Sequence, residues 1–215
     1  RGEMSFATVP HATLAALESR LDSYSQSLNG LVGFLDASDA VTALDWRHMV
    51  SALGIKDNLP GLTGLGYIRL VDARKTDNLK AEMRAMGIDN LHIHPETGQD
   101  QKLIVTYFEP AEAYALAAGL DIASEENQRA TAMQSRDSGK SLITPPVKWS
   151  QGDHIKTGFL LLLPHYQRGM PLGTEAERRA AFSGWVFAWL DASRLFSELT
   201  DSQDELFHFR VTDPL

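Results

Sequence analysis

No cysteine occurs among the 215 residues of the sequence. Its absence excludes disulfide bonds, thiolate nucleophiles, iron–sulfur clusters and zinc sites of the cysteine type. Unbroken apolar runs such as 159–163 are far shorter than the roughly 18 to 20 residues of a membrane-spanning helix. Cations are outnumbered, with 20 Lys and Arg against 28 Asp and Glu and a formal net charge of −8. A nucleic-acid or anionic-membrane surface needs clustered cations, so neither is expected.

Enough apolar material is present for a folded core. Apolar residues make up 43% of the sequence and charged residues 22%, which is typical of globular rather than disordered chains. The length suits one large domain or two packed lobes. No signal peptide is visible and the sequence opens at Arg1 rather than Met, so we expect an excised or processed piece of a longer protein.

The strongest periodic signal lies near the N-terminus. Apolar residues recur there at alternating spacings of three and four, the a/d pattern of a heptad repeat: Leu14, Leu17, Leu21, Tyr24, Leu28, Leu31 and Leu35. A helix over 14–35 would be about 33 Å long. Two interpretations are open: the stripe packs on its own domain, or it forms a seam with the same helix of a second copy.

Signals of further helices and strands follow in irregular order. Thr42 with Asp45 predicts a capped helix ending near Gly54, Thr174 with Glu177 predicts another, and Ser124 is the expected cap of a third. Strands are expected at 67–71, 91–94, 102–109, 142–149, 158–166, 184–190 and 206–212, and further helices at 77–86, 110–119, 124–139 and 192–199. This order favours an α+β fold with antiparallel sheets, and the turn-rich segment 167–173 predicts a boundary.

No motif indicates catalysis. Gly139-Lys140-Ser141 lacks the upstream glycine of a phosphate-binding loop, and no Gly-x-Ser-x-Gly motif is present. His92 and His94 lie on one face of an expected strand, but a His-x-His pair without a third ligand is a weak metal signal. We therefore expect no metal ion, no cofactor and no enzymatic activity.

One carboxylate has unusual surroundings. Asp121 follows Gly119 and Leu120 and precedes Ile122 and Ala123, a largely apolar setting. It can serve as a structural turn or cap residue, which is a common role of aspartate. Alternatively it anchors the N–H groups of a ligand in a small cavity, because a buried carboxylate is costly without such partners. Spacing alone does not choose between the two roles.

Several groups of residues, in order along the chain, resemble the CHASE domain family. The first half carries Phe34, Ala37, Ser38, Val41, Trp46-Arg47 and Pro60-Gly61, followed by Gly64, Gly66 and Tyr67. The second half carries Tyr107-Phe-Glu-Pro110, Gly119-Leu-Asp-Ile-Ala-Ser-Glu125, Arg129, Arg136-Asp-Ser-Gly139, Gly158-Phe-Leu-Leu-Leu-Leu-Pro-x-Tyr166 and Gly184-Trp-Val-Phe-Ala-Trp-Leu-Asp191. The resemblance covers about residues 30 to 200, and it rests on order and spacing rather than on a single motif.

The resemblance implies an extracytoplasmic sensor domain of a histidine kinase, nucleotide cyclase or diguanylate cyclase. Such domains have a long N-terminal helix followed by two PAS-like lobes. We therefore expect helices in 1–58, a membrane-distal, ligand-binding lobe in 59–166 and a membrane-proximal lobe in 167–215. The membrane segments and the output enzyme, a kinase or a cyclase, would lie outside this chain.

The resemblance also implies a ligand site in the distal lobe. Plant cytokinin receptors of this family bind an adenine-type ligand through an Asp and a main-chain group, and these positions match Asp121 and Ile143. A Thr that holds the tail of that ligand matches His154, a departure that argues against the plant ligand itself.

The residues themselves predict an apolar slot at the same place. Side chains alternate along 159–163, so one set should face the helices and the other the ligand. The residues expected to line the slot, with Asp121 at one end, are Tyr107, Leu142, Ile143, Phe159 and Leu161. The alternative is that these positions belong to an ordinary core.

The functional prediction is a periplasmic or otherwise extracytoplasmic sensor domain, without enzymatic activity, of a membrane-bound signalling protein. It would bind a small molecule, adenine-type or another small metabolite, and shift the N-terminal helices of a homodimer. The alternative is a dimerisation or partner-binding module without a small-molecule ligand. A third hypothesis, a metal-dependent enzyme, rests only on His92 and His94.

Overall fold

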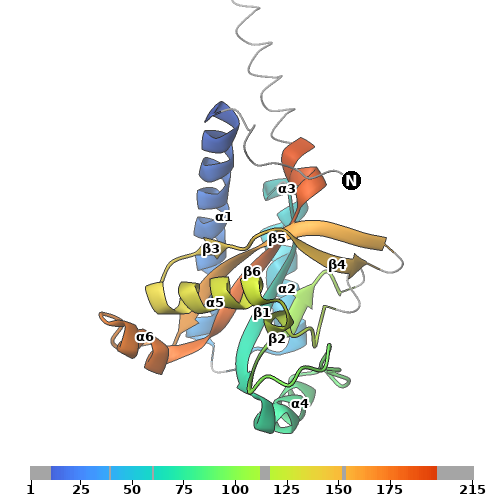
Figure 1. Ribbon diagram of the computed structural model, residues 1–215, viewed down its shortest axis with the longest axis vertical. Helices are drawn as coiled ribbons and strands as arrows, with labels where there is room; N and C mark the ends of the chain where they lie inside the picture. The colour runs from blue at the N-terminus through green and yellow to red at the C-terminus, as the bar shows by residue number, and fades with distance from the viewer. Residues whose placement is uncertain (1–10, 39, 60, 112–116, 152–153, 198–215) are drawn as a thin grey trace, which may run out of the picture.

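The computed structural model describes residues 11–38, 40–59, 61–111, 117–151 and 154–197 (Figure 1). A long helix, α1 (His11–Ala37), precedes α2 (Ala43–Leu53) and α3 (Ile55–Asn58). The strands are β1 (Leu62–Asp72), β2 (Gln101–Glu109), β3 (Leu142–Ile143), β4 (Val147–Gln151), β5 (His154–Tyr166) and β6 (Phe182–Asp191). Between them lie the 3₁₀ turns η2 (Ala73–Lys75) and η4 (Ile122–Ser124) and the helices α4 (Thr76–Ala85), α5 (Glu126–Ser138) and α6 (Glu175–Ala181).

Helix α2 forms where the capping signals predicted it. Thr42 Oγ1 accepts the Asp45 N–H, and the Asp45 carboxylate accepts the Thr42 N–H at 2.9 Å, which makes a reciprocal capping box. Gly54 then adopts a left-handed conformation with φ 55° and ends the helix. Helix α6 begins with the same box at Thr174 and Glu177.

The described strands form one antiparallel sheet. Their order is β2-β1-β6-β5-β3, and β4 pairs with the first part of β5. Strands β2 and β3 therefore lie at opposite ends of this order. The predicted α+β fold, with a long N-terminal helix and antiparallel strands, is confirmed.

The segment 167–215 contributes a central strand to this sheet. Strand β6 pairs with β1 over residues 62–68 and with β5 over 158–166, so it fills the gap between two strands of 59–166. The expected boundary at 167–173 is therefore a connection from β5 to α6 within one sheet. Residues 198–215 lie outside the described residues, and a separate membrane-proximal lobe stays a prediction.

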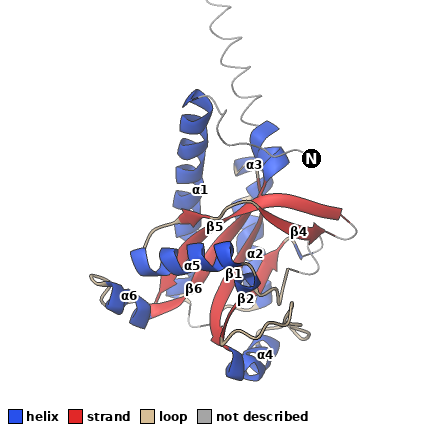
Figure 2. Cartoon of the chain, viewed as in Figure 1, coloured by secondary structure: helices blue, strands red, loops and turns tan. Residues whose placement is uncertain are grey.

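Two hydrophobic cores lie on opposite faces of the sheet because side chains alternate along each strand. The α1 face packs under α1, α2 and α4, and its strand residues include Phe159, Leu161, Leu163, Val186, Ala188 and Leu190. The α5 face packs under η4 and α5, and its strand residues include Leu160, Leu162, Trp185, Phe187 and Trp189. Figure 2 shows α5 lying across the sheet in the foreground.

The apolar stripe of α1 packs on the chain's own core. Tyr24, Leu28 and Leu31 are at most 2% exposed and belong to the core of the α1 face, with Leu17, Leu21 and Leu35 packed against it. The first interpretation of the stripe therefore holds from Leu17 to Leu35. A second copy of α1 would have to contact a different face of the helix.

The sequence-based boundaries differ from the structure in several places, among them the expected strand 142–149, which is two strands, β3 and β4. Strand β1 begins at Leu62 rather than at 67, because the glycine-rich stretch before it is extended: a Cβ at Gly64 would lie 2.2 Å from the Phe108 ring. Residues 91–94 form no strand beyond a bridge from His94 to Leu120. Helix α5 is preceded by Glu125 and not by Ser124, which ends η4. The expected strand 206–212 and most of the expected helix 110–119 lie outside the described residues.

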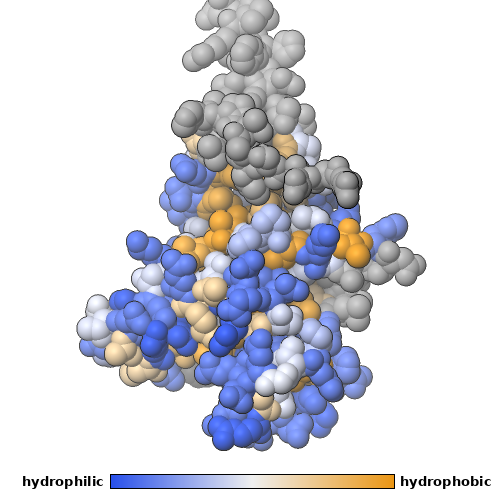
Figure 3. All heavy atoms as spheres, viewed as in Figure 1, coloured by the Kyte–Doolittle hydropathy of each residue, from blue (hydrophilic) through white to orange (hydrophobic). Residues whose placement is uncertain are grey.

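The surface is mostly polar. Figure 3 shows hydrophilic side chains over the lower part of the molecule, around α4 and α6, and apolar surface higher up, beside α1 and toward β4 and β5. Large apolar side chains are exposed at Phe34, Leu44, Ile155, Met170 and Leu172. None of the described helices combines the length and the hydropathy needed to cross a membrane.

Candidate functional site

Asp121 lies against the outer edge of strand β2. Its carboxylate is wholly buried, and Oδ1 accepts the N–H of Ala123 at 3.1 Å, which caps η4, and the N–H of Leu103 at 2.9 Å. The Asp121 N–H donates to the His94 carbonyl at 2.7 Å. Because β2 is the last strand of the sheet, the outward N–H of Leu103 needs this partner. The cap role considered from the sequence is therefore present.

The second carboxylate oxygen of Asp121 has longer contacts. Thr97 Oγ1 lies 3.3 Å and Lys102 Nζ 3.5 Å from Oδ2, beyond the roughly 2.7–3.0 Å of a strong hydrogen bond. Lys102 is only 8% exposed and donates more closely to Thr97 Oγ1, at 2.9 Å. Thr97 and Lys102 were not predicted as site residues, although a lysine at the start of an apolar strand is a signal. Oδ2 retains the capacity to accept a shorter bond.

Several buried polar atoms lie on segments next to Asp121 and at the start of α5. Within the described residues, His94 Nε2 and Gln99 Oε1 have no hydrogen-bond partner, although the Gln99 amide N–H donates to the Ala123 carbonyl at 3.0 Å. On α5, Gln128 Oε1 and Arg129 Nε are buried in the same way, and Gln128 is 6% exposed. Native proteins leave few buried polar atoms without a partner, so these atoms are candidates for contact with a bound molecule or water.

The predicted apolar slot is divided between the two faces of the sheet. Tyr107, Phe159 and Leu161 belong to the core of the α1 face, whereas the turn η4 that follows Asp121 packs in the core of the α5 face. These three side chains are therefore not brought to Asp121. Alternation along β5 divided its residues correctly into two sets, but it could not tell which set lies on the Asp121 side. That set is Leu160 and Leu162.

Ile143 lies in β3, at the other end of the strand order from β2. It pairs with Leu161, while the N–H of the next residue, Thr144, donates to the Leu160 carbonyl at 2.9 Å. Bonded and non-bonded pairs alternate in an antiparallel ladder, so the N–H and C=O of Ile143 point away from β5. Leu142 is half-buried in the same strand, and His154 is exposed at the start of β5.

His92 and His94, the pair that gave the weak metal signal, lie side by side but do not belong to a named strand. The rings of His92 and His94 are stacked, with centroids 5.9 Å apart and planes 18° from parallel. No group of three or more metal-ligating side chains occurs in the part of the chain that the structure describes.

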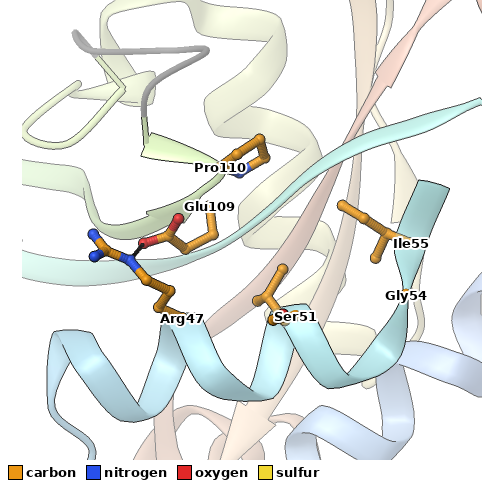
Figure 4. Close-up of a pocket in the computed structure, with 7 residues that line it drawn as sticks. Arg47, Ser51, Gly54, Ile55, Glu109 and Pro110 are labelled. Carbon is orange, nitrogen blue, oxygen red and sulfur yellow. Dashed lines mark hydrogen bonds and ion pairs between the residues drawn. The ribbon is translucent and has the colours of Figure 1, made fainter.

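A pocket of about 310 Å³ opens between α2 and the end of β2 (Figure 4). Arg47 and Glu109 point toward one another there, and Arg47 Nε donates to Glu109 Oε1 at 3.0 Å. The other carboxylate oxygen accepts the Ala111 N–H at 3.1 Å. Both oxygens of this nearly buried carboxylate thus have donors, and Ser51 and Ile55 line the opposite end of the pocket.

The structure thus combines a long helix on one face of an antiparallel sheet with a buried carboxylate at the sheet edge. The family model of the CHASE domain matches residues 39–214, and the chain therefore belongs to the CHASE family. CHASE domains are extracytoplasmic sensor domains of membrane receptors and are not catalytic. The resemblance inferred from the sequence is confirmed.

The chain is also similar to a plant protein, probable histidine kinase 4 of Oryza sativa subsp. japonica. The two are 27% identical over 141 residues, which is 65% of this chain and 13% of the plant protein. The similarity thus spans only a small part of that relative's length.

Proposed function

We propose that this CHASE domain is the ligand-sensing part of a membrane-bound receptor of the histidine-kinase type. A small molecule binds beside Asp121, and its binding shifts α1 within a homodimer. The observation that carries the proposal is the Asp121 carboxylate, which two main-chain N–H groups fix at Oδ1, while the contacts of Oδ2 with the described residues are at 3.3 and 3.5 Å. A carboxylate held in this way is oriented to accept N–H groups from a ligand.

The surrounding groups favour a ligand that carries both donors and acceptors. His94 Nε2 and Gln99 Oε1 add polar atoms without partners among the described residues. Helix α5 begins directly after η4, the turn that Asp121 caps, and lies across the sheet (Figure 2). The ligand accordingly lies beside Asp121, at the start of α5. An adenine-type heterocycle has the required mixture of N–H donors and ring-nitrogen acceptors.

Transmission through α1 follows from its attachment to the sheet. Its buried stripe, centred on Leu28, joins the helix to the core of the α1 face, so a change in the sheet moves the helix with it. The opposite face of α1 is exposed and is the surface left for contact with a second copy: Glu18, Asp22, Gln26, Asn29 and Gly33.

A thermal-shift screen of purines, nucleosides, amino acids and carboxylates, with adenine as the first probe, identifies the ligand class. Calorimetric titration of Asp121→Asn then tests the site. Asparagine keeps the shape but replaces one acceptor oxygen with a donor, so affinity should fall about ten- to a hundredfold.

Asp72→Asn is the matched control. Asp72 caps η2 as Asp121 caps η4, by accepting the N–H two residues on, in this case from Arg74 at 2.9 Å. Its substitution should leave affinity unchanged. Unaltered affinity in Asp121→Asn would show that Asp121 is a structural cap only, and the site assignment would then be dropped.

A further inference from the structure

A second cleft, of about 620 Å³, opens on the α1 face of the sheet, the face opposite to η4 and α5. It lies between the connection from α1 to α2, helix α4 and the adjoining ends of β5 and β6. Its volume falls within the range of about 300–1,000 Å³ found for small-molecule sites. The polar and charged side chains that line it include Ser38, Tyr67, Arg69, Glu82, Tyr107 and His165.

We propose that this cleft is a second ligand site, which binds a free α-amino acid with an apolar side chain in its zwitterionic form. The ammonium group meets Glu82 and the carboxylate meets Arg69. This site shares no residue with the one proposed at Asp121.

The charges that line the cleft form a pair that a guest can open. Arg69 Nη1 donates to Glu82 Oε1 at 2.5 Å, but the two side chains are 34% and 48% exposed, so solvent screens the pair and it contributes little to stability. A zwitterion gives each of these groups a new partner of opposite charge. A simple anion would contact only the guanidinium and a simple amine only the carboxylate, whereas a zwitterion contacts both. The charge balance therefore selects a guest with both charges.

Two phenol groups lie in the wall of the cleft. Burial raises the pKa of Tyr107 to about 12 and also raises the pKa of Tyr67, so both hydroxyls stay neutral near pH 7. The Tyr107 hydroxyl donates to the Val41 carbonyl at 2.6 Å, which leaves its oxygen able to accept an ammonium N–H.

The second phenol is fixed by a chain of hydrogen bonds that starts in α1. Asp36 Oδ1 lies 3.0 Å from His165 Nε2, and the Tyr67 hydroxyl lies 2.8 Å from His165 Nδ1. A carboxylate only accepts, so in the neutral form of the imidazole Nε2 carries the proton and Nδ1 accepts the Tyr67 O–H. The Tyr67 oxygen keeps a lone pair for a guest, and the guest is thereby linked to the last turn of α1.

The rest of the lining suits an apolar side chain. Methionine fills irregular space and adapts its shape, which accommodates guests of similar size. The apolar residues concerned are Leu35, Met83 and Met86.

Calorimetric titration with L-leucine tests the site on the 215-residue chain. The matched probes are 4-methylpentanoate, which lacks the ammonium, and 3-methylbutylamine, which lacks the carboxylate. We expect leucine to bind and each analogue to bind at least about tenfold more weakly. Arg69→Gln and Glu82→Gln should each lower leucine affinity at least about tenfold, whereas Arg74→Gln, in the exposed ion pair with Asp72, should not.

Absence of leucine binding at millimolar concentration would overturn the proposal. So would equal affinities for leucine and the two analogues, a result that needs no variant. Asp121→Asn should leave leucine affinity unchanged, so the two proposed sites succeed or fail separately.

Discussion

The two faces of the sheet differ in how they are filled. On the α5 face, aromatic rings pack against one another: Trp149 stacks on Trp189 at a centroid separation of 4.7 Å, and Phe108 on Phe187 at 5.7 Å. The strands of the α1 face carry mainly aliphatic side chains under α1, and the two clefts described above open at the margins of that face. The polar groups of the α5 side are instead gathered at the sheet edge, beside Asp121.

The same contrast appears in two aspartates with alike local geometry. Asp72 and Asp121 each cap a 3₁₀ turn by accepting the N–H two residues on. The side chain of Asp72 is 31% exposed and pairs with the exposed Arg74, whereas Asp121 is wholly buried beside Lys102. If each aspartate is substituted, a difference between the two losses in the free energy of unfolding should therefore reflect burial rather than cap geometry.

The largest effect is expected for Asp121→Leu. It removes the acceptor of two main-chain N–H groups and leaves the buried Lys102 charge without its carboxylate, so the free energy of unfolding should fall by about 3–5 kcal/mol. Asp72→Leu should cost much less, because its carboxylate is partly exposed and caps only a three-residue turn. Urea unfolding of both variants measures the difference. Equal losses would mean that burial adds nothing and that Lys102 finds another partner.

Features with strong local signals were predictable from the sequence. Apolar spacing predicted α1, and capping boxes predicted α2 and α6. The start of β1 was not predictable, because Gly64 and Gly66 serve there to admit the rings of Phe108 and Phe187 from distant strands. The early strand thus depends on contacts that no local pattern records.

In the candidate site, too, some residues were predictable from local sequence and others were not. Asp121 was identified from its own apolar neighbours and from the family resemblance. Its partners Thr97 and Lys102 lie 24 and 19 residues away in sequence, so only the fold brings them to it. The side chains of β5 were divided into two sets by alternation, but the face of each set is decided by which helices cover it.

A smaller effect on stability is expected when alanine replaces a glycine of the tightly packed α5 face. The same change on the open surface of α1 should have the opposite sign. A Cβ at Gly66 would lie 2.4 Å from the Phe187 ring and 2.5 Å from the Tyr107 carbonyl oxygen, so Gly66→Ala should lower the free energy of unfolding by about 1–3 kcal/mol. A Cβ at Gly33 of α1 meets nothing within 4 Å, so Gly33→Ala should raise it by about 0.5–1 kcal/mol. Calorimetric unfolding compares the two. A neutral Gly66→Ala would contradict the tight packing assigned to the α5 face.

The smallest effect concerns the junction of α5 and α6, beyond the edge of the aromatic core. Asp137 accepts hydrogen bonds from Arg179 on both oxygens, at 2.9 and 2.7 Å, and from Arg136 Nε at 2.7 Å. The bonds from Arg179, and then those from Arg136, hold the pKa of the Asp137 carboxyl well below its usual range, although partial burial opposes this.

Because the folded pKa of Asp137 lies below its unfolded value of about 3.9, the carboxylate contributes stability that is present above that pH and lost as pH falls toward the folded pKa. Asp137→Asn should therefore lower the free energy of unfolding at pH 7 by about 1 kcal/mol or less, since Arg179 is half exposed and the pair is screened. The difference in the free energy of unfolding from the parent chain should narrow below about pH 4.

Asp77→Asn, at a carboxylate that is 95% exposed, is the control and should change stability little at either pH. Urea unfolding at neutral and acid pH makes the comparison. A difference that stays constant with pH would show that Asp137 acts through its shape and hydrogen bonds alone, and that its charge does not hold α5 and α6 together.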